Sequence, residues 1–188
     1  MKKVFVLLVA CAMAMPLLNS CKKGENDPGI SLKSRKARLT AEWTLKEGTE
    51  TETSGTTTVT TYTGTSVSYG SGTASPYSET LTYNTDGTFE WKMVSGLNSN
   101  TYEGSWFFGS KIKELDLKNK ESVIMVCTKS TSVSGGVTNQ ATYDGANAQI
   151  FTFIIDELKS KELILKLDGT TTSGTVSTTT GTKTYEAK

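Results

Sequence analysis

Histidine is absent from this sequence of 188 residues. Its absence excludes Ser-His-Asp and Cys-His nucleophilic sites, a histidine general base, zinc held by histidine and haem with a proximal histidine. The glycines lie in Thr/Ser-rich segments and turns, so no phosphate-binding loop opens a helix, and no loop of alternating acids suits calcium. We therefore expect a non-enzymatic protein without a metal ion or cofactor.

Paired carboxylates are the catalytic arrangement that survives this exclusion, because a glycosidase can work with two of them and no histidine. Four acidic residues are close in sequence: Glu79, Asp86, Glu90 and Glu103. Asp86 is better explained by a tight turn, and we expect the three glutamates on the wet faces of strands. A hydrolase is therefore the least favoured alternative.

Long apolar runs are lacking except at the N-terminus, where Lys2 and Lys3 precede the run Val4–Met15. This run is too short for a membrane-spanning helix and is typical of a cleaved export signal. Leu18-Asn19-Ser20-Cys21 resembles the lipobox of bacterial lipoproteins, in which the cysteine receives the lipid. We expect cleavage before Cys21 and acylation of that residue, with groups such as palmitate. The alternative is an ordinary secretory signal that happens to contain a cysteine.

A membrane location follows from that lipid, because two or three acyl chains anchor a protein stably. No aspartate stands directly after Cys21, so by resemblance to known sorting patterns we expect an outer-membrane lipoprotein of the cell envelope, facing the periplasm or the outside. Removal of residues 1–20 leaves 18 basic and 19 acidic side chains. Such a near-neutral chain does not attract nucleic acid. We expect a monomer.

Cysteine is scarce, with three residues in the whole chain. Cys11 leaves with the signal and Cys21 takes the lipid, so Cys127 has no disulfide partner. Cys127 ends the apolar run Ser122–Cys127, and we expect it to be a small buried hydrophobe.

Three regions follow from composition. Residues 1–20 are the predicted signal peptide, and residues 21–36, rich in charged and small residues, are predicted to be the lipidated N-terminus and a flexible tether. Residues 37–188 are long enough for one domain with a sizeable core. A short helix is expected within Leu32–Leu39.

Alternation of apolar and polar residues dominates the rest of the chain and predicts strands with one buried face. It is clearest in Thr80–Tyr83 and Phe89–Met93. Asn84–Thr88 between them is a hairpin signal, because Gly87 can take a positive φ and Asp86 can close the turn with its side chain.

Threonine, serine and glycine fill three further stretches, Thr49–Thr73, Thr128–Thr142 and Thr170–Thr184. Disorder is one interpretation, but β-branched threonine favours strands, so we interpret the stretches as long strands with polar faces. Pairing of the first strand with the last would close the sheet and remove its edges. The prediction is an all-β fold, a single antiparallel up-and-down barrel of about eight to ten strands.

Five segments between Leu39 and Leu167 carry a family resemblance. They look like the lipocalin-like domain of small Bacteroidetes lipoproteins, and this resemblance implies a lipocalin-like barrel. The segments are Leu39–Leu45, Leu81–Phe89, Gly104–Trp106, Ile155–Leu158 and Leu163–Leu165.

Aromatic side chains are the remaining candidates for function. A barrel of about eight strands can just enclose a small ligand, so Trp91, Trp106, Phe108 and Tyr83 are predicted to line a cavity for a small apolar molecule. The resemblance implies that Trp43 plugs one barrel end. Two alternatives remain open: these rings simply fill the interior, or the Thr-rich hairpins present a surface to glycans, host molecules or envelope proteins.

Overall fold

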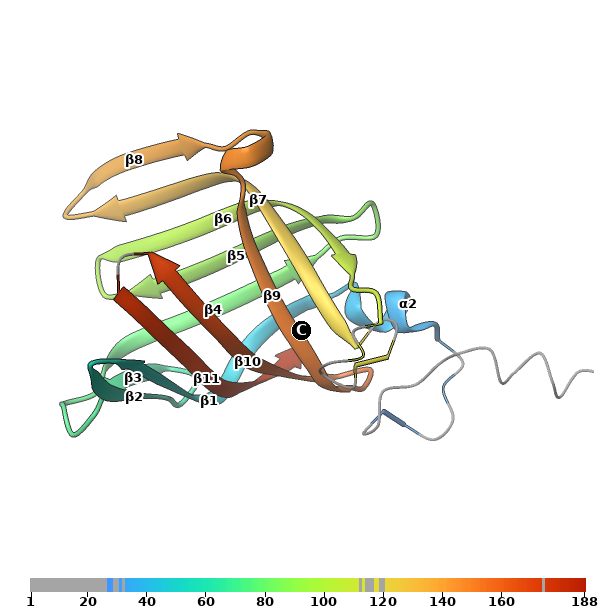
Figure 1. The fold of residues 1–188 in the computed structure, drawn as a ribbon, viewed down its shortest axis with the longest axis horizontal. Coiled ribbons are helices and arrows are strands. Elements are labelled where there is room, and N and C mark those ends of the chain that lie inside the picture. The colour runs from blue at the N-terminus through green and yellow to red at the C-terminus, as the bar shows by residue number, and fades with distance from the viewer. Residues whose placement is uncertain are drawn as a thin grey trace, which may run out of the picture.

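The computed structural model of the protein describes residues 27–28, 31, 33–111, 113, 117–118, 121–173 and 175–188. The predicted signal peptide and lipidation site lie outside these ranges. Within them the chain is almost entirely β-structure (Figure 1). The strands, in chain order, are β1 (Glu42–Ser54), β2 (Thr56–Tyr62), β3 (Ser66–Tyr69), β4 (Ser75–Tyr83), β5 (Thr88–Ser95), β6 (Asn98–Phe108), β7 (Ser122–Ser134), β8 (Val137–Thr142), β9 (Gln149–Leu158), β10 (Glu162–Ser173) and β11 (Thr175–Ala187).

The sheet closes on itself. Its order is β6-β5-β4-β3-β2-β1-β11-β10-β9-β7-β8, and a further pairing joins β6 to β7. All pairings are antiparallel, and β8 pairs with β7 outside the closed ring. The fold is therefore a closed antiparallel barrel of ten strands, and the predicted fold class is confirmed. First and last strands meet, as expected, because β1 pairs with β11 from Trp43 to Thr53.

The barrel has two unlike ends. Near one end, β1 pairs directly with β4 at Glu42–Thr44, so eight strands surround the axis. Further along, β1 pairs instead with β2 from Gly48 to Ser54, and the β2–β3 hairpin brings the ring to ten strands. We call the first the α2 end, after the helix α2 (Arg35–Leu39) beside it, and the second the hairpin end.

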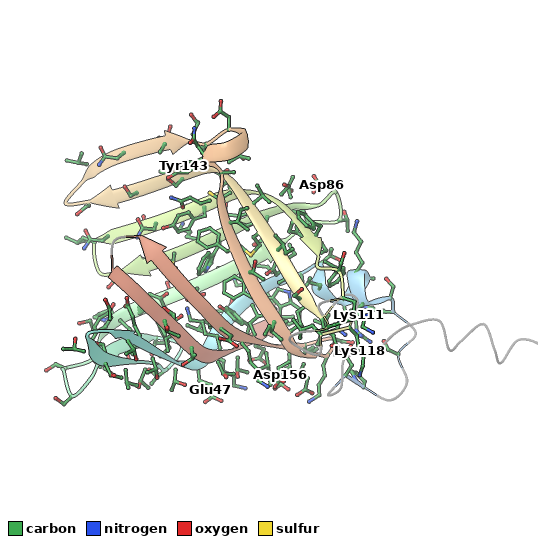
Figure 2. All side chains as sticks on the ribbon, in the orientation of Figure 1. Glu47, Asp86, Lys111, Lys118, Tyr143 and Asp156 are labelled. Atoms are coloured by element: carbon green, nitrogen blue, oxygen red, sulfur yellow. The ribbon has the colours of Figure 1, made fainter. Side chains whose placement is uncertain are left out.

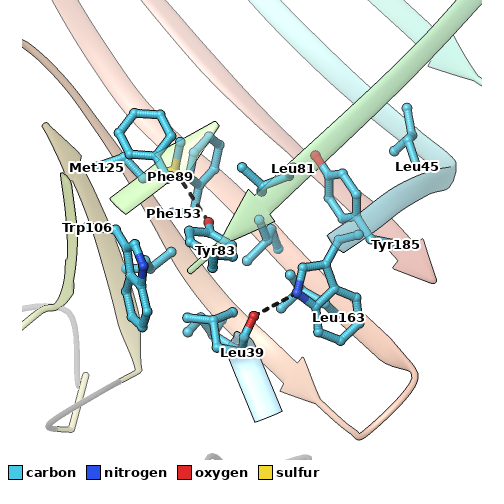
Figure 3. Packing of buried hydrophobic residues seen from close by; sticks show 14 of the residues in the cluster. Leu39, Leu45, Leu81, Tyr83, Phe89, Trp106, Met125, Phe153, Leu163 and Tyr185 are labelled. Carbon is cyan, nitrogen blue, oxygen red and sulfur yellow. Dashed lines mark hydrogen bonds between the residues drawn. The ribbon is translucent and has the colours of Figure 1, made fainter. Parts of the chain in front are cut away.

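Helix α2 confirms the expected short helix. Ser34 caps it, because its side-chain oxygen accepts a hydrogen bond from the backbone N–H of Ala37. Leu39 at its C-terminus is fully buried, and the carbonyl of Leu39 accepts a hydrogen bond from Nε1 of Trp43 at 2.8 Å (Figure 3). The helix thus covers the narrow end of the barrel. No helix among the described residues is long and apolar enough to cross a membrane.

Alternation along the strands produces the core. In β4 the side chains of Glu79, Leu81 and Tyr83 are buried, and those between them are less so. Figure 3 shows part of the resulting cluster, which spans opposite walls of the barrel. Its apolar members gather toward the α2 end and include Leu39, Trp43, Leu45, Leu81, Tyr83, Trp106, Val123, Leu158, Leu163, Leu165 and Tyr185.

The local predictions also hold. Gly87 has a φ of 91°, and Asp86 Oδ1 accepts a hydrogen bond from the backbone N–H of Thr88 at 2.9 Å, which closes the β4–β5 turn. All three Thr-rich stretches contribute strands, among them β2, β8 and β11. Cys127 is a buried free thiol.

Candidate binding site in the barrel interior

The aromatic residues predicted to line a cavity lie at different depths. Tyr83 and Trp106 are buried in the core, with ring centroids 5.3 Å apart. Phe108 packs against Trp106 in an edge contact at 5.5 Å. Trp91 is half-buried and lies nearer the hairpin end, away from that group. The structure therefore brings Tyr83, Trp106 and Phe108 together and leaves Trp91 in a second cluster. Trp43 is fully buried beside α2.

Trp91 belongs to a cluster that crosses the interior. Its ring centroid lies 5.1 Å from that of Phe151, 5.7 Å from that of Phe153 and 5.7 Å from that of Tyr102. Strands β5 and β9 are not neighbours in the sheet, so the contacts of Trp91 with Phe151 and Phe153 span the barrel. Trp91, Tyr102 and Phe151 are half-buried, and we call these three side chains the aromatic wall.

Glu79 corrects one expectation from the sequence. We expected its carboxylate on a wet strand face, whereas its residue exposure is 1% and it points into the barrel. The alternation itself held the signal: Glu79 is two residues from Leu81 and four from Tyr83, so all three share one face of β4. The expectation is wrong because charged side chains are usually exposed, whereas the register of β4 places this one on the inner face. Glu90, in contrast, is exposed.

Four donors satisfy the Glu79 carboxylate. Oε1 accepts hydrogen bonds from the Tyr185 hydroxyl at 2.6 Å and from Trp91 Nε1 at 2.9 Å. Oε2 accepts them from the Tyr77 hydroxyl at 2.7 Å and from Lys183 Nζ at 3.0 Å. A buried carboxylate is tolerated when it is paired and hydrogen-bonded in this way.

Lys183 links this carboxylate to a second one. Its Nζ lies 2.9 Å from Glu50 Oε1, and Glu50 Oε2 accepts a hydrogen bond from the Tyr62 hydroxyl at 2.7 Å. The ammonium also lies 4.4 Å from the centroid of the Tyr62 ring, which is a cation–π contact. We call Glu79, Lys183 and Glu50 the ionic floor. Two carboxylates and one ammonium give it a net charge of −1.

The electrostatics hold the ionic floor charged. Burial would raise the pKa of Glu79, but Lys183 and the hydrogen bonds from Tyr185 and Tyr77 outweigh it, and the net pKa lies below its usual range. Burial would lower the pKa of Lys183, but Glu79 and Glu50 more than compensate, so its pKa is raised. Burial and neighbouring Glu79 raise the pKa of Tyr77 and Tyr185 well above its ordinary value, so both remain donors.

Gly48 makes room for this arrangement. It pairs with Lys183 across the β1–β11 ladder, and a Cβ at position 48 would lie 2.9 Å from Cγ of Lys183. Any larger residue there would push the lysine side chain out of its place over β1.

Two carboxylates so close together resemble the catalytic pair of a glycosidase, and their surroundings decide against that chemistry. Because Glu50 and Glu79 both contact Lys183 Nζ, at 2.9 and 3.0 Å, their contacting oxygens are no more than about 6 Å apart. A glycosidase needs one of the pair protonated near neutral pH. Here the pKa of Glu79 is lowered and Lys183 occupies the space between the two groups, so the arrangement binds charge and does not supply an acid.

Described residues line several surface hollows, among them three with volumes between about 230 and 460 Å³. The largest, about 460 Å³, lies on the outer side of β11, β1 and β2 and is lined mainly by Lys46, Glu47, Thr49, Thr61, Thr182 and Thr184. The others, of about 330 and 230 Å³, lie near Lys159–Glu162 and around Gly64–Ser78. None of the three is lined by Trp91 or Trp106.

Comparison with known proteins adds no assignment: no family model, curated protein or solved structure matches the chain. Within the part of the chain that the structure describes, no group of three Cys, Asp or Glu side chains is placed to hold a metal ion.

Proposed function

We propose that this chain is a non-enzymatic lipoprotein of the cell envelope, cut before Cys21 and anchored by lipid on that residue. Its lipocalin-like barrel binds a small, mainly apolar ligand on the aromatic wall, beside the ionic floor. The fold is compatible with this function, since barrels of this size hold single small ligands.

One observation carries the proposal: Trp91, Tyr102 and Phe151 are only half-buried although their rings pack together in the barrel interior. Rings deeper in the interior, such as Tyr83, are packed on all sides. Apolar rings that stay accessible inside a concave surface are typical of ligand sites. The bond from Trp91 Nε1 to Glu79 fixes the indole, so the wall is organised before a ligand arrives.

The sheet opens beside this wall. The ladder between β9 and β10 runs only as far as Ile154 and Lys166, and toward the hairpin end the two strands diverge (Figure 1). Half-buried Phe151 and Leu167 follow on the two strands beyond that point. We propose that a ligand reaches the wall from this side of the barrel.

Glu50 adds a polar contact. Its side chain is 20% exposed, and each oxygen that binds Tyr62 or Lys183 retains a second lone pair. With the negative charge of the ionic floor, this favours a ligand that carries a hydrogen-bond donor or a positive charge at one end of an apolar body.

Native mass spectrometry of the protein purified from its own host tests the proposal. We expect a co-purifying small molecule that is released on unfolding. A clean apo mass under gentle conditions would count against ligand binding.

Binding of a neutral apolar dye, N-phenyl-1-naphthylamine, locates the site when it is compared between variants. Phe151→Ala should weaken dye binding about tenfold or more, because it removes one ring of the aromatic wall. Phe107→Ala is the matched control, since Phe107 is 50% exposed on the outer side of β6. Equal binding by both variants and the wild-type protein would exclude this wall as the site.

Lipidation has its own test. The mature protein from host membranes should begin at Cys21 with the added mass of two or three acyl chains, and Cys21→Ser should prevent that addition. An unmodified mass at Cys21 would overturn the anchor without affecting the ligand site.

A surface module is the second candidate, favoured by the 460 Å³ groove on the outer wall. Its threonine hydroxyls could bind a glycan or a protein. Thr61→Val and Thr182→Val together should then abolish binding in a glycan-array screen, while Phe151→Ala should leave it unchanged.

A further inference from the structure

Asp27 ties the segment that precedes the barrel to the α2 end. Its Oδ2 lies 2.6 Å from Arg38 Nη2 and 3.3 Å from Arg35 Nη1, both on α2. Its Oδ1 accepts a hydrogen bond from the backbone N–H of Leu158, the last residue of β9, at 3.0 Å. The Asp27 side chain is fully buried. Part of the predicted tether is thus held on the barrel, and we call these contacts the Asp27 latch.

The latch limits where the lipid can be. Cys21 is six residues before Asp27, and six extended residues span about 20 Å at most. Wherever residues 21–26 run, an acyl group on Cys21 starts within that distance of Asp27, and the hairpin end lies on the opposite side of the molecule (Figure 1).

Charge differs between the segment that precedes the barrel and the barrel itself. Residues 22–40 carry six basic and two acidic side chains, whereas residues 41–188 carry 12 basic and 17 acidic ones. Lys33 and Lys36 of the first group are exposed, and so are Lys113 and Lys118 of the second. Figure 2 shows Lys118 toward the α2 end of the molecule. Asp86, near Lys36, is an exposed acid on the same side.

We propose that the α2 end is a membrane-facing surface that contacts anionic lipid headgroups, so that the barrel stands on the bilayer with its hairpin end pointing away. The orientation rests on the lipidation proposed above; the headgroup contact does not. Each lysine close to an anionic surface strengthens binding about fivefold, and the net negative barrel is repelled from the same surface. The ligand route between β9 and β10 then faces the aqueous side.

Vesicle partitioning tests the surface without the lipid. The chain with residues 1–21 omitted keeps every contact of the Asp27 latch. It should bind vesicles that contain 30% phosphatidylglycerol in phosphatidylcholine and not vesicles of pure phosphatidylcholine, and binding should fall at high salt. Lys33→Gln and Lys36→Gln should each weaken binding about fivefold. The matched control, Lys92→Gln, changes an exposed lysine on β5 and should have no effect. Equal binding to both vesicle types would overturn the proposed surface.

Headgroup quenching tests the orientation in the lipidated protein, after its mass has shown the acyl chains. A fluorophore is attached at Lys36→Cys on α2 or at Leu97→Cys, which replaces an 87% exposed residue of the β5–β6 turn. A nickel-chelating lipid should quench the label at position 36 several times more than the label at 97. Equal quenching would overturn the orientation.

Asp27→Asn tests the latch in the same assay. The amide keeps the shape of the side chain and loses the charge that pairs with Arg35 and Arg38, so the difference in quenching between positions 36 and 97 should shrink. Asp86→Asn, the control at the same end, should preserve it. An unchanged difference in Asp27→Asn would show that the latch does not orient the barrel.

Discussion

At the scale of single residues, Glu79 is a buried carboxylate whose charge depends on its hydrogen-bond partners. Its carboxylate accepts hydrogen bonds from four side chains, and removing it leaves buried donors without a partner. We expect Glu79→Ala to lower the free energy of unfolding by about 3 kcal/mol or more, the range for one partner of a buried ion pair. Urea unfolding followed by tryptophan fluorescence measures this change.

Glu90→Ala is the control for that measurement. Glu90 is exposed on the neighbouring strand β5, and its loss should change the free energy of unfolding by no more than about 0.5 kcal/mol. If the two variants lose equal stability, the interior network contributes nothing beyond an ordinary surface glutamate.

The ionic floor also sets a pH range for stability. The pKa of Glu79 is lower in the folded chain than in the unfolded one, so its contribution is full above the unfolded value of about 4.3 and is lost as pH falls through the folded value. The pKa of Lys183 is raised, so its contribution is full below the unfolded value of about 10.4 and is lost as pH rises through the folded value. We therefore expect a plateau between these limits in the urea midpoint, and a shallower acid decline in Glu79→Gln. If the urea midpoint of that variant falls at acid pH as steeply as that of the wild-type protein, other carboxylates cause the loss of stability.

At the scale of elements, the β6–β7 ladder depends on a close approach. The register shifts between Glu103 and Gly104, and a Cβ on Gly104 would lie 2.0 Å from the carbonyl oxygen of Val126. The strands would have to separate to admit it. We expect Gly104→Ala to lower the free energy of unfolding by about 1–3 kcal/mol, the usual cost of overpacking.

Gly169→Ala on β10 is the matched substitution, because a Cβ there meets no atom within 4 Å. It should leave stability unchanged or raise it slightly, since glycine weakens a strand. Thermal unfolding of the two variants is measured side by side. If only Gly104→Ala is destabilised, the cause is the close approach of β6 and β7, and if both are, alanine is unfavourable at either strand position.

The elements also show which features of the fold can be predicted from the sequence. Alternation and turn chemistry were sufficient for the β4–β5 hairpin, because Asp86 and Gly87 act locally. The partnership of Glu79 with Lys183 could not be predicted in the same way, because 104 residues separate them and closure of the barrel alone brings them together. The burial of Asp27 depends likewise on Leu158, 131 residues away. The alternation along a strand predicts which face of the sheet a residue occupies. It does not predict which residue on a distant strand will be its partner across the interior.

At the scale of the whole molecule, the barrel is built unevenly along its axis. The apolar core gathers at the α2 end, whereas β8, toward the hairpin end, is exposed along its whole length. Burial of apolar side chains supplies most of the stabilisation of a fold, so the two ends should open with different free energies.

Hydrogen exchange followed by mass spectrometry measures that difference. Amides of Trp43–Leu45, Leu81–Tyr83 and Leu163–Leu165 should exchange only by global unfolding, because their side chains lie in the core. Amides of Val137–Thr142 should exchange orders of magnitude faster by local opening. A ligand on the aromatic wall would slow exchange in Gln149–Phe153, next to the separation of β9 and β10, and leave the α2 end unchanged. Uniform protection from one end to the other would mean that the barrel opens as a single unit and that the proposed ligand route requires global unfolding.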